Sequence, residues 1–141
     1  IPDFAIGRAG WDNWMIYQAR RQGWKTIDAT DEIQIIHQSH DYSHLPGGKP
    51  HYHLPESDEN VRLAGGRRTI FNIPDANWRY QDGKIKRAKC TGKRFLRELE
   101  IFPLITLKSI FLGEVAHLVM NPRKLWAAVR ARLVGKKQEQ E

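Results

Sequence analysis

A proline- and glycine-rich stretch, DYSHLPGGKPHYHLPESDEN at residues 41–60, divides this chain of 141 residues into two parts. Three prolines and a Gly-Gly pair interrupt helical and strand hydrogen bonding alike, so the stretch predicts a loop. Each side of the loop has its own pattern of apolar residues and predicts its own elements. Because a chain of this length is within the range of a single domain, we expect one domain with an appendage.

Before the loop, apolar residues at spacings of three and four predict a helix over 11–22, which Gly23 ends. The run WKTIDAT that follows predicts a short strand. EIQIIH, residues 32–37, predicts a second strand, because the run is short, rich in branched residues and without a helix start signal. Period-two alternation places on one face of it Ile33, Ile35 and His37. A helical alternative has a stripe of Ile33, Ile36, His37 and His40.

After the loop, RRTIFNIPDANWRYQDGKIKRA at residues 67–88 predicts two or three short strands, with Asp82-Gly83 at a hairpin turn. From residue 94 onward the pattern favours helices, and the last of them is amphipathic and basic. The expected helices cover residues 95–102, residues 104–120 with Pro103 at the start, and residues 122–134.

The formal net charge of +7 and the pI near 9.8 favour an anionic partner. A nucleotide diphosphate, a phospholipid surface and a nucleic acid all satisfy that description. Basic residues between 67 and 97 are interleaved with aromatic ones, which is compatible with nucleic-acid binding. The chain contains no recognisable nucleic-acid module, however, so we interpret the band as solvated basic surface and expect no nucleic acid as a partner.

The longest apolar run, residues 101–120, is interrupted by Lys108, Glu114 and His117, which are costly in a bilayer. We therefore expect no membrane-spanning helix, although basic C-terminal helices are compatible with peripheral association at a membrane. The single cysteine, Cys90, permits no internal disulfide, and no secretion signal is visible. These features predict a cytoplasmic protein. Since the sequence begins IPDF without an initiator methionine, we expect it to be a fragment, the downstream part of something longer.

The run GRAGWDNWMI at residues 7–16 places Asp12 in the first turn of the expected helix. A carboxylate there stabilises the positive end of the helix dipole, and it also suits a general base at the rim of a cleft. Arg8 predicts either a forked contact with phosphate or substrate, or a surface ion pair. Trp11 stacks on a sugar or base face or packs in the core, and Asn13 adds a neutral donor or acceptor beside Asp12.

Five of the six histidines are clustered, which raises the expectation of a metal site because neutral imidazole is a good ligand for divalent metals. With one distant cysteine, the spacing does not match a closed structural zinc site. Loop histidines bonded to backbone and solvent are the alternative. The clustered residues are His37, His40, His44, His51 and His53.

Gly-Arg, Gly-Trp-Asp-Asn at a helix start, two strands and a His-Gln-Ser-His strand end follow one another over the first 45 residues. This order resembles the acceptor half of a GT-A type glycosyltransferase, a Rossmann-like nucleotide-diphospho-sugar transferase. The runs FAIGRAGWDNWMIYQA, IDAT and HQSHDYSH, with AGGRRTIFNIPDANW further on, are similar to a group of bacterial and plant glycosyltransferase-like proteins. The resemblance covers about residues 2–80.

The resemblance implies an α/β fold: the C-terminal portion of a GT-A fold, followed by a small β appendage and C-terminal helices. Residues 1–55 are then the acceptor-side part of the catalytic domain, and residues 56–92 a β-hairpin appendage. Residues 93–135 are a C-terminal helical segment, and residues 136–141 a disordered tail.

Proteins of this family transfer a sugar from a nucleotide-sugar donor to an acceptor hydroxyl. The implied acceptor is either a glycan or a lipid-linked molecule. The resemblance implies that Asp12 is the catalytic base. It implies that His37 is a ligand of a divalent metal, Mn²⁺ or Mg²⁺, which neutralises charge on the leaving diphosphate. The implied substrate-binding residues are Arg8, Trp11, Asn13 and His40.

The chain departs from the family pattern at two points. Trp11 replaces the glutamate of the usual acidic pair, which leaves Asp12 as the local carboxylate, and the chain contains no Asp-Xaa-Asp motif for the first metal and nucleotide contacts. We therefore expect the donor site to lie outside this chain and the chain alone to be inactive. Two alternatives are a non-catalytic basic module that binds anionic lipid or nucleic acid, and a metal-dependent hydrolase that uses the histidine cluster.

Overall fold

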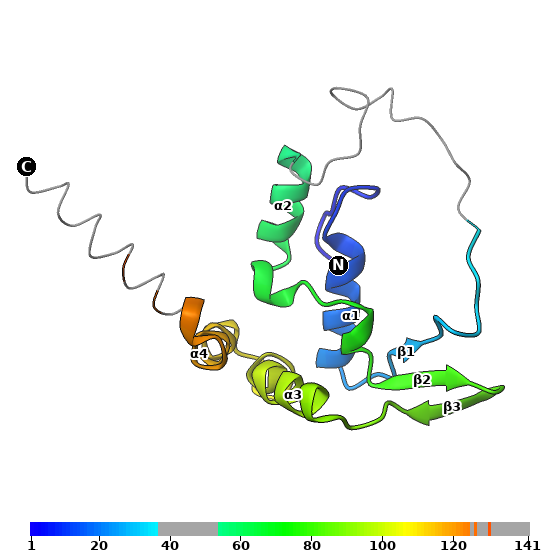
Figure 1. Cartoon of the computed structure of the whole chain (residues 1–141). Helices are drawn as coiled ribbons and strands as arrows, with labels where there is room; N and C mark the ends of the chain where they lie inside the picture. Colours follow the sequence, from blue (N-terminus) through cyan, green and yellow to red (C-terminus); the bar gives the residue numbers. More distant parts are fainter. Residues whose placement is uncertain (37–53, 125, 127–129, 131–141) are drawn as a thin grey trace, which may run out of the picture. The chain divides into compact units, whose positions relative to one another are not determined.

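The chain is a mixed α/β protein with a small three-stranded sheet, as the computed structural model shows for residues 1–36, 54–124, 126 and 130 (Figure 1). This confirms the α/β class predicted from the sequence, whereas the GT-A assignment stays a prediction. The chain forms two compact units, Ile1–Cys90 and Thr91–Glu141. We call the first the N-terminal unit and the second, which contains a hairpin of two helices, the hairpin unit.

The first helix, α1, spans Trp11–Arg21 and confirms the helix predicted over 11–22. It starts after Gly10, whose φ of 107° is in the left-handed region that glycine adopts without strain. Towards the interior α1 buries Trp14, Tyr17 and Arg20. The strand predicted in WKTIDAT is also confirmed, as β1 at Ile27–Asp28.

The second strand, predicted at 32–37, is wrong for the described residues 33–36, which contain no strand. The amides of Glu32 and Ile33 instead donate to the Ala29 carbonyl at 3.0 and 2.9 Å, which forms a turn. Ile35 and Ile36 are 85% and 90% exposed. A branched apolar run forms a strand only where another strand satisfies its backbone groups, and this one has no such partner among the described residues.

The loop predicted over 41–60 is wrong at its C-terminal end, where helix α2 spans Pro55–Leu63. Pro55 occupies the first turn of α2, a position at which proline costs no helical hydrogen bond and already has the right φ. Glu56 and Asp58 add negative charge to the same turn. Proline therefore starts a helix here instead of excluding one, and residues 41–53 lie outside the described residues.

The β-hairpin predicted in the N-terminal unit is confirmed by β2 at Trp78–Gln81 and β3 at Lys84–Arg87, which pair antiparallel. Its turn has φ values of 51° at Asp82 and 69° at Gly83, as a two-residue hairpin turn requires. Further strands upstream are not observed, because Arg67–Thr69 and Ile73–Asp75 are short 3₁₀ helices, η2 and η3. Strand β1 pairs parallel with β2, so residues about 50 apart in sequence share one sheet.

The core of the N-terminal unit lies between α1 and the segments that follow α2. The Tyr17 and Phe71 rings meet edge to face with centroids 5.3 Å apart, and Phe71 is fully buried. Phe4 packs on Trp14 at a centroid distance of 5.1 Å. The Arg20 guanidinium donates to the Asp75 carbonyl, so a buried cation links α1 to η3.

The hairpin unit consists of α3, Gly92–Ile105, and α4, Ile110–Met120. The boundary predicted at Pro103 is wrong: Pro103 lies inside α3, and the break comes after Ile105. Ser109 explains the break, because its hydroxyl accepts from the Leu112 amide at 3.2 Å and so caps α4. Beyond α4, residues 122–124 are helical, in agreement with the helix predicted over 122–134 where it is described.

Helices α3 and α4 are antiparallel and approach closely at one glycine. Glu100 contacts His117 and Leu104 lies against Gly113, two pairs in the same antiparallel register. A Cβ atom added to Gly113 would lie 2.5 Å from Cγ of Leu104, which is buried. The spacing of the two helices therefore depends on the absence of a side chain at position 113.

We predict that Gly113→Ala destabilises the hairpin unit, although alanine is intrinsically the better helix former by about 1 kcal/mol. Overpacking against Leu104 outweighs that gain, and we expect a net loss of about 1 to 2 kcal/mol in the free energy of unfolding. Urea unfolding followed by circular dichroism measures it. Gly92→Ala is the matched control, since no atom lies within 4 Å of the added Cβ, and it should be close to neutral. A Gly113→Ala variant as stable as the original would contradict the close packing.

Candidate functional site

The segment that contains Gly-Arg, residues 5–10, is held in place by one buried amide from α2. Asn60 is fully buried, and its Oδ1 accepts from the Ala5 amide at 2.8 Å. Its Nδ2 donates to the Ala5 carbonyl at 3.0 Å and to the Ala9 carbonyl at 3.2 Å. Three hydrogen bonds from one side chain thus fix the turn that carries Arg8 and leads into α1.

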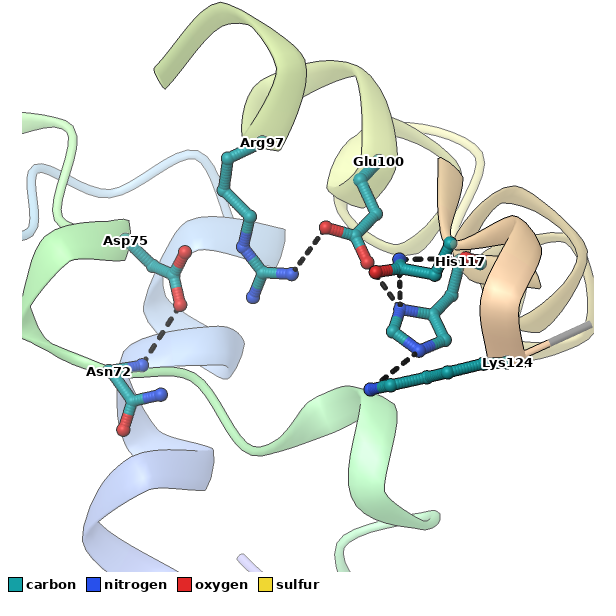
Figure 2. Close-up of polar contacts among 7 residues, drawn as sticks. Asn72, Asp75, Arg97, Glu100, His117 and Lys124 are labelled. Carbon is teal, nitrogen blue, oxygen red and sulfur yellow. Dashed lines mark hydrogen bonds and ion pairs between the residues drawn. The ribbon is translucent and has the colours of Figure 1, made fainter. Parts of the chain in front are cut away.

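The start of α1 is tied to the run AGGRRTIFN by Asn13. The Asn13 Nδ2 donates to the Phe71 carbonyl at 2.6 Å and to Asn72 Oδ1 at 3.2 Å, while the Phe71 amide donates to the Asn13 carbonyl at 3.3 Å. Asn72 is fixed in turn, because its amide donates to Asp75 Oδ2 at 2.9 Å (Figure 2). Two segments 58 residues apart therefore meet at the first turn of this helix.

Asp12 lies next to this junction and is exposed. Its Oδ1 accepts from the Asn13 amide at 2.9 Å, and its Oδ2 has no partner among the described residues. It is not the helix cap, since that position is Gly10. The helix and the hydrogen bond from Asn13 position the carboxylate, and a general base must be positioned in this way.

The other sequence-predicted residues fall into three groups. Trp11 and Arg8 are half-buried, and Arg8 makes no ion pair with any described carboxylate. Asn13 is used in the backbone contacts above, so its amide positions the helix. His37 and His40 lie outside the described residues. Among the residues that are described, no three metal-ligating side chains gather, so metal binding stays a prediction.

A hollow of about 330 Å³ lies on the α2 side of the same turn. Glu59 at its rim forms an ion pair with Arg62, at 2.6 Å between Oε1 and Nη2, and the hydrogen bond from Arg62 lowers the pKa of Glu59. The lining combines acidic and apolar side chains. The lining residues are Asp3, Ala5, Pro55, Glu56, Glu59 and Asn60.

Sequence reasoning missed Asn60 because it placed this residue in a loop. The signal that would have found it is Pro55, which starts a helix and puts Asn60 in its second turn. An asparagine near the middle of a short helix is unfavourable unless its side chain has specific partners, and here it has three.

A second polar cluster, also missed, lies between α3 and α4. Glu100 Oε2 accepts from Arg97 Nη1 at 3.0 Å, and Glu100 Oε1 contacts His117 Nδ1 (Figure 2). On the other side of the ring, Lys124 Nζ lies 3.5 Å from His117 Nε2. Asn121 Nδ2 lies 3.2 Å from His117 Nδ1, so polar groups face both ring nitrogens. His117 was visible in the sequence only as an interruption of the apolar run 101–120.

The environment of Glu100 has opposing effects on its pKa. Burial acts to raise the pKa, but hydrogen bonds from His117 and Arg97 outweigh it, so the pKa lies below its ordinary value of 4.5. Glu100 therefore stays ionised in the folded hairpin. The cluster satisfies its own charges and stabilises the contact between the two helices.

Comparison with known proteins gave no match: no family model, no curated protein and no solved structure is significantly similar to this chain. The interpretation of the site therefore depends on its residues and their geometry.

We predict that Asn60→Asp destabilises the N-terminal unit by about 3 kcal/mol, because a carboxylate would face the Ala5 and Ala9 carbonyls in a buried position. Thermal and urea unfolding measure the loss. Gln81→Glu is the matched control, the same amide-to-acid change at an exposed strand residue, and should stay within about 0.5 kcal/mol. A loss equal to the control's would mean that Asn60 does not organise the turn.

We predict that the hairpin unit loses stability as the pH falls below about 4.5, the ordinary value for Glu100. A carboxylate with a lowered pKa in the folded state stabilises that state above its ordinary pKa and loses this contribution as it is protonated. Helicity followed by circular dichroism against pH tests this. Glu100→Gln should flatten the acid limb, and Glu56→Gln, at an exposed position, should not. An unchanged acid limb in Glu100→Gln would contradict the assignment.

Proposed function

We propose that this chain carries the acceptor side of a glycosyltransferase that uses a nucleotide sugar, with Asp12 as the general base. The observation that supports it most directly is the junction at Asn13, which joins the helix start GWDN to Phe71 and Asn72 of the run AGGRRTIFN. Both runs belong to the part of the chain that resembles the family. Residues of one site must lie close together in space, and these two runs do so although they are 58 residues apart in sequence.

The proposed role of Asp12 follows from its environment. As the acceptor hydroxyl attacks the anomeric carbon of the donor sugar, Oδ2 of Asp12 accepts the hydroxyl proton, and the nucleotide diphosphate leaves with the bonding electrons. Oδ1 stays bonded to the Asn13 amide, so the carboxylate keeps its orientation.

Arg8 and Trp11 complete the proposed acceptor side. Arg8 is in the turn that Asn60 fixes, and its guanidinium suits a phosphate or a sugar hydroxyl. Trp11 is half-buried at the start of α1, where an indole face suits the apolar face of a sugar ring. His37 stays the proposed metal ligand, with a divalent ion that would stabilise the leaving diphosphate.

We predict that Asp12→Asn, in the protein encoded by the complete reading frame, lowers kcat for sugar transfer by about 100-fold or more. Because Asp12 acts on the acceptor, the Kd for the nucleotide sugar should stay within about twofold. Transfer is measured with a panel of nucleotide sugars and hydroxyl acceptors, and donor affinity by calorimetry. The expected result is thus a loss of turnover without a loss of donor binding.

Asp58→Asn is the matched control, since Asp58 is an exposed carboxylate in the first turn of the other helix of this unit. It should leave both quantities unchanged. Turnover that survives Asp12→Asn would remove Asp12 from the mechanism. A complete protein that binds none of the nucleotide sugars would overturn the proposed function itself.

A further inference from the structure

The outer faces of the two helices in the hairpin unit are apolar. On α3, Phe95, Leu99 and Phe102 follow one another at spacings of four and three, and they are 54%, 50% and 47% exposed. With 3.6 residues per turn, this stripe lies on the side of α3 opposite to Glu100 and Leu104, which contact α4. The side chains that a soluble helix normally buries therefore point away from the partner helix.

Helix α4 repeats the arrangement. Phe111, Val115 and Val119 recur every four residues and are 74%, 42% and 67% exposed, opposite to Gly113 and His117. Leu107, in the connection between the helices, is 53% exposed. The two stripes point away from each other, on opposite sides of the hairpin, and Leu107 lies at the end where the helices connect. We call the two stripes together with Leu107 the outer face.

The contact between the helices is mixed in character. Glu100, which also pairs with Arg97 of its own helix, contacts His117 of α4 (Figure 2). Leu104 is buried against Gly113, where the helices approach most closely. Polar side chains as links and a small residue at the closest point are typical of helix pairs whose surroundings are lipid. A hairpin with this contact inside and apolar stripes outside is suited to an apolar environment.

The dimensions of the hairpin limit how far it enters a bilayer. At 1.5 Å per residue, α3 and α4 are about 21 and 17 Å long, whereas a hydrocarbon core is about 30 Å thick. In agreement with this, none of the described helices is long and apolar enough to cross a membrane. The hairpin fits entry part of the way into one leaflet with the connection at Leu107 leading, because this orientation places both stripes among the acyl chains and the open end at the headgroups.

The positive charge of the hairpin unit indicates which kind of lipid surface it would bind. Residues 91–141 contain ten Lys or Arg and five Glu, and two of these carboxylates are paired within α3, Glu98 with Arg94 and Glu100 with Arg97. Lys93 at the start of α3 and Arg123 just beyond α4 are exposed, and an antiparallel hairpin brings these two positions to the same end. Trp126, 74% exposed, adds a side chain that prefers the headgroup region.

From these observations we infer that the hairpin unit docks on an anionic phospholipid surface, with its outer face among the acyl chains and its cations at the headgroups. A second copy of the chain is disfavoured as the occupant, because pairing two hairpins would bring together two surfaces with the same excess of positive charge. The inference is independent of the proposed glycosyltransferase function, since it uses other residues.

The test is co-sedimentation of the full chain with phosphatidylcholine vesicles, with and without phosphatidylserine. We expect binding to the anionic vesicles, weakened at about 1 M salt, where charges are screened within about 3 Å. Phe111→Ser with Val119→Ser should reduce the affinity at least about tenfold, because two exposed apolar side chains no longer enter the bilayer. Ile73→Ser with Ile85→Ser is the matched control on the exposed surface of the N-terminal unit, and should bind like the original.

A charge-reversal pair separates the contribution of the cations. Lys93→Glu with Arg123→Glu should weaken binding to anionic vesicles by about 30-fold or more, at roughly one factor of five per neutralised cation. Lys84→Glu with Lys89→Glu, exposed in the N-terminal unit, is its control. Circular dichroism confirms that each variant keeps its helices.

Three results would overturn the inference. The first is no binding to anionic vesicles at low salt, and the second is equal binding by Phe111→Ser with Val119→Ser. The third is a vesicle-free dimer, seen by light scattering, that the same pair converts to a monomer. This last result would assign the outer face to a second copy of the chain.

Discussion

The candidate site depends on the buried amide of Asn60. Its three hydrogen bonds satisfy backbone groups of residues 5–9 that have no helix or strand to bond to, and they hold this turn against α2. Gly10 follows this turn with a φ of 107°, which glycine adopts without strain, and so lets α1 start where the turn ends. A Cβ atom added to Gly10 would lie 3.6 Å from Asn60 Cβ. The turn that leads into α1, and with it the start of the helix at Asp12, therefore depends on one side chain of another helix.

The buried polar side chains have different partners in the two units. In the N-terminal unit, buried polar side chains such as Asn60 and Arg20 satisfy backbone carbonyls beside an aromatic core. In the hairpin unit, Glu100 and His117 satisfy one another across the helix contact, and stripes of apolar side chains are exposed on the outside. The difference suggests different surroundings: water for the first unit and, as we infer, a lipid surface for the second.

Local patterns predicted the elements that local interactions stabilise. The spacing of Trp11 and Trp14 predicted α1, and Asp82-Gly83 predicted the hairpin turn, because helix periodicity and turn geometry are fixed within a few residues. The run 33–36 failed because a strand depends on a partner far away in sequence. For the same reason Asp12 was found from its position at a helix start, whereas Asn60 and Glu100, whose partners lie 55 and 17 residues away, were not.

The same separations in sequence affect the order of folding. The contacts of the hairpin unit close a short loop, from Glu100 to His117, while the bonds of Asn60 close loops of 51 and 55 residues that contain the whole proline-rich stretch. Closing a longer loop costs more chain entropy, and contacts of long range form more slowly. During synthesis the turn that carries Arg8 leaves the ribosome before α2, yet its hydrogen bonds form only after α2 has followed it. This turn therefore waits for about 50 further residues before it reaches its native conformation.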